Sequence, residues 1–199
     1  MKKTFLSLAL ITSSLVLFSF TKKSTTEIYK VDTEKSTIGW IGRKVAGDHK
    51  GNIKLLSGVL NTDGNTIQSG SFAIDMNSMT CSDLQGEWNA KLIGHLKSDD
   101  FFAVDKHPKA NFEITKINPS TANKLAVSGK LTIKGVTQNI SFIATVKQKD
   151  NALVAIAEGV KVDRTKYGIK YSSKSFFENL GDKVIDDEFE LSITLVATK

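Results

Sequence analysis

Apolar and polar side chains alternate along most of the chain beyond residue 70. The clearest run has its apolar positions at Phe189, Leu191, Ile193, Leu195 and Ala197. Polar residues occupy the positions between them, and only Val196 breaks the polar row. A period of two residues is typical of a β-strand with one face buried and the other in water. The alternation therefore predicts a mainly β protein.

The same pattern recurs in about eight segments at spacings that suit β-hairpins. Other clear runs begin at Phe72, Ala110, Leu125 and Ile140. Asp63-Gly64 is a strong hairpin signal ahead of them, and no parallel strand-helix-strand rhythm is present. A sandwich or a barrel fits this spacing, but closure into a barrel removes the exposed strand edges. We therefore predict an antiparallel eight-stranded barrel.

One segment, Ser82–Phe102, follows a helical period instead. Its apolar residues recur every four positions, at Leu84, Trp88, Leu92 and Leu96. This spacing forms one apolar stripe on an amphipathic α-helix. Ser82 and Gln85 fit a capping box, which satisfies the first free N–H groups. Because Gly86 and Gly94 each weaken a helix by about 1 kcal/mol, we expect the stripe to be held against the barrel or across its mouth.

Two stretches nearer the N-terminus are less regular. Gly47–Gly51 is rich in glycine and predicts a turn after a strand over Ser36–Val45. Ile53–Leu60 carries apolar residues on both parities, so the pattern does not assign a buried face to this strand.

The first residues are typical of a secretory signal. Lys2 and Lys3 precede a short apolar core that continues to Phe20. We expect residues 1–23 to be a signal peptide with a short tether, residues 24–199 to form one barrel domain, and the protein to be exported to the periplasm or secreted. No small-x-small cleavage site stands out over Ser19–Ser24, so an uncleaved N-terminal anchor is the alternative.

Charge and cysteine content add little specific chemistry. The formal net charge of +6 falls to +4 when residues 1–20 are removed, since Lys2 and Lys3 are the only charged residues lost. A mild, dispersed excess in an exported protein does not favour nucleic acid. Cys81 is the only cysteine, so an internal disulfide is excluded. We expect a buried, inert thiol there, although a position beside a helix start can activate one.

No catalytic or metal-binding motif is present. His49, His95 and His107 are too far apart for a local metal motif, and no haem-attachment or nucleophile-elbow sequence occurs. Gly129–Gly135 lacks the order of a phosphate-binding loop. We therefore expect a protein that is not an enzyme and has no metal and no cofactor, apart from a bound lipid.

The interior of the predicted barrel has two interpretations. Large apolar residues such as Trp40, Phe72, Phe112, Phe142 and Phe189 are expected to point inward. In an eight-stranded barrel such side chains either fill the core or surround one small ligand. The alternation is the same in both cases, so the pattern alone does not separate them.

Several motifs together resemble the YceI-like family of exported lipid-binding proteins. They span about residues 27–198 and are Tyr29–Asp32 with Ser36–Trp40, His95–Phe102 leading into His107–Phe112, Gly129–Thr137, and Asp163–Ile169. The resemblance implies a lipocalin-like barrel with helical cover and an elongated apolar tunnel. The tunnel would take a polyisoprenoid or another long lipid tail. The predicted tunnel wall is Ile38, Trp40, Phe72, Ile74, Leu92, Leu96, Phe112, Ile114, Leu131, Ile133, Phe142, Phe189, Leu191 and Ile193.

Head-group contacts are expected from basic residues near the C-terminal third. The candidates are Arg164, Lys166, Tyr167 and Lys170, with Lys44 and His49 as secondary ones. A basic run with a phenol suits a pyrophosphate or carboxylate, and the alternative is an exposed polar strand face. The chain departs from the family pattern at Asn89–Lys91, where many relatives carry an Arg-Asp pair, and in an extra loop over Tyr171–Leu180. These departures leave tail length and head group open.

These observations favour a non-enzymatic lipid carrier or sequestering protein. A filled barrel acting as a periplasmic or surface interaction module is the main alternative, and an enzyme acting on isoprenoid or other lipid substrates is a third. The expected partner is a long-chain lipid such as a polyisoprenoid, with transient membrane-surface contact and no nucleic acid. The protein is expected to be a monomer or a dimer.

Overall fold

The computed structural model describes residues 26–121, 123–149 and 151–199, and the predicted signal peptide lies outside them. The strands are β1 (Thr26–Val31), β2 (Thr37–Lys44), β3 (Gly47–Asp63), β4 (Thr66–Cys81), β5 (Lys109–Thr121), β6 (Lys124–Ile133), β7 (Val136–Lys149), β8 (Ala152–Asp163) and β9 (Glu188–Thr198). The helices are α1 (Gly86–Lys97) and the short 3-10 helices η1 (Arg164–Tyr167) and η2 (Gly181–Lys183).

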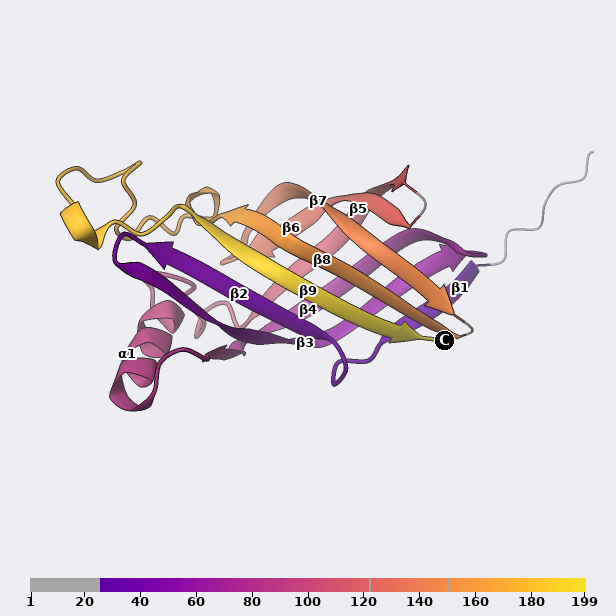
Figure 1. The fold of residues 1–199 in the computed structure, drawn as a ribbon, viewed down its shortest axis with the longest axis horizontal. Coiled ribbons are helices and arrows are strands. Elements are labelled where there is room, and N and C mark those ends of the chain that lie inside the picture. The colour runs from indigo at the N-terminus through magenta and orange to yellow at the C-terminus, as the bar shows by residue number, and fades with distance from the viewer. Residues whose placement is uncertain (1–25, 122, 150) are drawn as a thin grey trace, which may run out of the picture.

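The strands form one closed antiparallel barrel (Figure 1). Strands β2 to β9 follow one another around it, and β9 returns to pair with β2. Strand β1 continues the row that β2 occupies, because both strands pair with β3 on one side and β9 on the other. The nine described strands thus fill eight positions, which confirms the predicted eight-stranded barrel with one α-helix.

The irregular pattern of β3 has a structural cause. Its pairing with β4 shifts register between Leu55 and Ser57, where the strand carries a bulge. Leu55 is buried, whereas the next residue, Leu56, is 44% exposed. A bulge adds one residue to one strand and so changes which parity faces inward. Apolar residues on both parities are therefore compatible with one buried face.

The predicted turn over Gly47–Gly51 is wrong. The chain reverses before Gly47, and residues 47–51 form the start of β3, paired with β2. His49 lies opposite Gly42, and Gly51 lies opposite Trp40. Gly51 is needed here by close packing, since a Cβ atom would stand 1.8 Å from Thr80 O. Both glycines that suggested a turn thus belong to β3, and Gly51 stands where the strand is tightly packed.

Helix α1 lies in the connection between β4 and β5, at the barrel end opposite the C-terminus (Figure 1). It is shorter than predicted and has no capping box, since Gln85 makes no side-chain cap. The Ser82 hydroxyl instead donates to Lys50 O at 3.1 Å. The Asn89 side-chain amide donates to Cys81 O and Leu84 O at 2.9 and 2.8 Å. These bonds attach the start of the helix to the preceding loop.

The predicted apolar stripe of α1 faces the barrel only in the C-terminal half of the helix. Leu92 and Leu96 turn toward the barrel interior, whereas Trp88 is 70% exposed. Leu84 lies before the helix, which begins at Gly86. A four-residue repeat drifts around a 3.6-residue helix, so Trp88 has moved off the face that the barrel covers. In the described residues, no helix is both long and apolar enough to cross a membrane.

Candidate functional site

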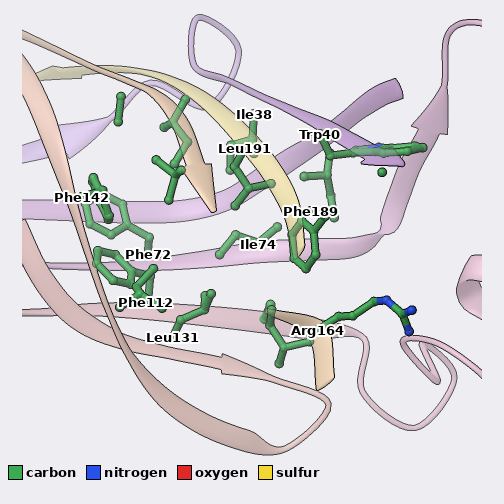
Figure 2. A pocket seen from close by; sticks show the side chains of 18 of the residues that line it. Ile38, Trp40, Phe72, Ile74, Phe112, Leu131, Phe142, Arg164, Phe189 and Leu191 are labelled. Carbon is green, nitrogen blue, oxygen red and sulfur yellow. The ribbon is translucent and has the colours of Figure 1, made fainter. Parts of the chain in front are cut away.

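The barrel is hollow, with an internal cavity of about 450 Å³ (Figure 2). This volume lies in the range of small-molecule sites. The cavity runs from the end that carries α1 to inner residues such as Leu60, Ile117 and Leu195 near the far end. The interpretation of a barrel filled by its own side chains does not fit this interior.

The wall of the cavity is built by alternate residues of β2 to β9 and by α1. Every residue of the predicted tunnel wall lines it, namely Ile38, Trp40, Phe72, Ile74, Leu92, Leu96, Phe112, Ile114, Leu131, Ile133, Phe142, Phe189, Leu191 and Ile193. Methionines that the prediction omitted, Met76 and Met79, also line it. The wall is almost wholly apolar, so it suits a hydrocarbon. Ligand contact by these residues stays a prediction.

Aromatic rings form a layer across the middle of the wall. Phe72 and Phe112 stack with ring centroids 6.2 Å apart, and Phe142 lies 5.7 Å from Phe112. Figure 2 shows these three rings on one side of the view, with Phe189 and Arg164 on the other. The three rings therefore form an aromatic part of the wall on the side of the cavity away from Arg164.

Polar and aromatic side chains meet at the mouth beside α1. His95 lies edge-on between Phe101 and Tyr171, with centroid distances of 4.9 and 4.7 Å. Its Nε2 lies 3.0 Å from Asp100 Oδ2. His95 and Tyr171 both line the cavity. This pair connects the helix to the loop that follows η1.

Arg164 lines the cavity, but its guanidinium is engaged by the main chain. Its Nε donates to Asp186 O at 2.9 Å, Nη1 to Ile169 O at 3.0 Å and Nη2 to Ile185 O at 3.0 Å. Nη2 also lies 3.7 Å from Asp187 Oδ1, which makes a longer ion pair. Burial lowers the pKa of Arg164, and the nearby carboxylates oppose that shift only in part. The structure thus gives Arg164 a role in holding the two loop segments together at the mouth.

The other three primary head-group candidates lie off the cavity wall. Lys166 is exposed and pairs with Asp163 at 3.8 Å, and Lys170 is also exposed. Tyr167 is buried, and its hydroxyl has no hydrogen-bond partner among the described residues. Burial, with a smaller effect of Asp163, raises the pKa of Tyr167 to about 12. The structure therefore does not bring Lys166, Tyr167 and Lys170 together with Arg164 at the cavity.

The secondary candidates, Lys44 and His49, do line the cavity near the mouth. His49 Nδ1 lies 2.8 Å from Asp83 Oδ2, and the Lys50 N–H donates to Asp83 Oδ1 at 2.8 Å. The Cys81 thiol, which is buried, donates to the same oxygen at 3.3 Å. Burial acts to raise the pKa of Asp83, but these hydrogen bonds outweigh it and lower the pKa to about 2.

Sequence reasoning missed several polar residues of the mouth. They are Arg43, His95, Tyr171, Asp186 and Glu188. His95 and Tyr171 stand in segments that the sequence marks, the helix and the extra loop, but no local pattern shows that these segments meet. In the part of the chain that the structure describes, no group of three or more His, Cys, Asp or Glu is placed to hold a metal ion.

Comparison with known proteins gives a family match and a shared fold. The sequence model of the YceI-like domain matches residues 29–197. A UPF0312 protein of Pseudomonas putida strain F1 is 32% identical over 151 residues, which is 73% of this chain and 73% of that protein.

Two solved structures have the same barrel. BcnA of Burkholderia cenocepacia superposes with a TM-score of 0.65 at 23% identity, covering 84% of this chain and 99% of that chain. A polyisoprenoid binding domain from Saccharophagus degradans, implicated in plant cell wall breakdown, gives a TM-score of 0.65 at 16% identity, covering 85% and 97%. At these identities the likeness is one of fold.

Proposed function

The chain belongs to the YceI-like domain family, and on that premise we propose that it is a non-enzymatic protein that holds a long-chain lipid inside its barrel. A polyisoprenoid or another long-chain amphiphile is the proposed ligand, carried, stored or sequestered with its tail in the cavity. The name of the similar polyisoprenoid binding domain supports this class of ligand.

The observation that carries the proposal is the apolar hollow. Its wall presents aliphatic and aromatic side chains along the length of the barrel. A hydrocarbon tail gains about 0.8 kcal/mol for each CH₂ group removed from water. Affinity then follows from wall area and needs no covalent chemistry, which is why we propose a binding protein and not an enzyme acting on lipids.

The proposed head-group contact is at the mouth. Among the described residues, Lys44 is the cationic side chain of the mouth for which no ion pair is seen. Arg164 donates to main-chain carbonyls, and Arg43 pairs with Glu190 at 2.9 Å. The two histidines there, His49 and His95, face Asp83 and Asp100. One lysine is a modest anchor for a pyrophosphate or carboxylate. We therefore expect the tail to dominate affinity, with weaker discrimination among head groups.

Export to the periplasm or secretion is part of the proposal. It is supported by the basic start and apolar core of residues 1–20. An isoprenoid or acyl lipid has low solubility in water, so a carrier outside the cytoplasm gives it a path between membranes.

Titration with fluorescent polyprenyl and fatty-acyl probes tests the proposal. The purified barrel should bind such probes with a stoichiometry near one per chain and release them to an unlabelled competitor of similar tail. Absence of binding to every long-chain probe, with the barrel folded by circular dichroism, would contradict it.

A further inference from the structure

The loop beside the cavity mouth exposes large apolar side chains. We call residues 170–184 the rim loop. Within it Tyr171, Phe176 and Phe177 are 41%, 47% and 51% exposed. Val45, at the turn between β2 and β3, is 63% exposed, and its N–H donates to Val184 O at 3.3 Å. Exposed apolar residues therefore lie at this end of the barrel, where Figure 1 shows the rim loop extending beyond the strand ends.

The rim loop is ordered at its base. Ser173 is fully buried, and its carbonyl accepts the N–H groups of Phe176 and Phe177 at 3.1 and 3.0 Å. The Ser175 hydroxyl donates to Asp187 Oδ2 at 2.6 Å. The two phenylalanines are thus presented outward by a fixed turn. Large exposed apolar side chains that gather in one place mark interaction sites.

Lysines stand among these aromatic residues. Lys170 Nζ lies 4.5 Å from the ring centroid of Phe176. The other exposed charged residues of the rim loop are Lys174, Lys183, Glu178 and Asp182, and the exposed Lys44 and Asp186 lie beside it. Aromatic rings beside lysines suit the head-group layer of a bilayer, where rings insert and lysines meet anionic phosphates. Because the cationic excess is small, apolar insertion should supply most of the binding.

We propose that the rim loop docks on a phospholipid bilayer, with Phe176 and Phe177 inserted among the head groups. This inference rests on the proposed function, because it explains how a lipid tail reaches the cavity. Tyr171 belongs both to the rim loop and to the cavity wall, so the mouth and the docking surface are continuous. A tail can then pass from the bilayer into the barrel with little exposure to water.

Sedimentation with vesicles of phosphatidylglycerol and phosphatidylethanolamine tests the docking. We expect the double variant F176S/F177S to partition onto vesicles more than about tenfold less than the wild type. The matched control is I143S/I156S, which removes two exposed apolar side chains of β7 and β8 from the outer wall. This control should keep wild-type partitioning, and vesicles of neutral lipid alone should bind the wild type more weakly.

A second readout separates docking from ligand binding. A fluorescent polyprenyl probe is offered either embedded in vesicles or diluted from ethanol. F176S/F177S should extract the probe from vesicles more slowly, yet take it up from ethanol dilution as the wild type does. Equal vesicle partitioning of F176S/F177S and I143S/I156S overturns the docking and leaves the proposed function standing. The same holds if the wild type does not bind vesicles and forms a dimer that F176S/F177S loses, because the rim loop would then contact a second copy of the chain. No uptake by either route overturns the proposed function.

Discussion

The ring of Phe112 lies directly over Gly129 on the neighbouring strand. A Cβ atom at position 129 would stand 2.4 Å from Phe112 Cζ and 2.5 Å from Glu113 O. There is no space for this Cβ atom unless a neighbour moves, since contacts of a Cβ atom with other heavy atoms stay above 3.0 Å. The absence of a side chain at position 129 thus fixes where the aromatic layer stands in the cavity.

Replacing Gly129 by alanine should therefore destabilise the barrel and displace Phe112 into the cavity. Overpacking of this kind costs about 1–3 kcal/mol, read from chemical denaturation. Gly42→Ala is the matched control, because the described residues leave the space around its Cβ open to 4 Å. Equal stability of the two variants would argue against the packing described.

Phe142→Asp should abolish uptake of a long-chain probe. The substitution places a carboxylate in an apolar cavity, where an unpaired charge is costly. It also removes a partly buried ring, which costs up to about 3–5 kcal/mol. Ile143→Asp is the control, since that neighbour is 47% exposed on the outer wall and should leave uptake unchanged. A folded Phe142→Asp protein that still binds lipid would contradict the inward direction of residue 142.

Much of the cavity wall could be predicted from the sequence because inward direction follows parity within a strand that has no bulge. Phe72, Phe112 and Phe142 stand in regular runs, and each lines the cavity. The sequence did not show whether the barrel is hollow, because filled and hollow barrels have the same alternation of apolar and polar residues. The difference lies in how far the rings reach across the barrel, which depends on backbone positions such as that of Gly129.

Arg164→Ala should loosen the mouth. The change removes donors to three main-chain carbonyls, at Ile169, Ile185 and Asp186. Leaving a buried acceptor without its donor costs about 1–3 kcal/mol, and hydrogen exchange should rise across residues 168–187. Lys166→Ala, at an exposed neighbour, should change neither quantity by much. If Arg164→Ala weakened binding of charged probes without changing stability or exchange, a direct head-group contact would be favoured instead.

Asp83 should make stability depend on acid pH. Its pKa of about 2 in the folded chain lies below its ordinary value of 3.8. The ionised form is therefore favoured by folding, and its contribution is present above about pH 3.8 and lost as the pH falls toward 2. The stability difference between wild type and Asp83→Asn should shrink over that window in urea titrations. Asp105→Asn, at an exposed carboxylate, is the matched control for the substitution itself.

The mouth could not be predicted with the same success, because its contacts join segments far apart in the chain. Arg164 seemed a ligand contact because its sequence neighbours are basic, yet its partners are carbonyls, which every residue carries. His95 meets Tyr171 only because α1 and the rim loop lie at the same barrel end. The predicted capping box failed for a similar reason, since the Ser82 hydroxyl donates to Lys50 O of β3 and the helix begins later in the chain, after Gln85.

Ala157→Phe probes the hollow from within, because Ala157 lines the cavity and an added ring would occupy it without adding charge. We expect this variant to fold and to bind long-chain probes at least about tenfold more weakly, since lost tail burial costs about 0.8 kcal/mol per CH₂. Glu158→Phe, at an exposed neighbour, should bind as the wild type does.

Native mass spectrometry of the protein purified from its own cells, membranes included, tests the lipid-carrying cavity most directly. We predict a bound species whose mass and fragments identify a single long-chain lipid in the wild type, reduced or absent in Ala157→Phe. Protein that emerges free of lipid, and stays so after incubation with polyprenyl and fatty-acyl lipids, would contradict the proposal.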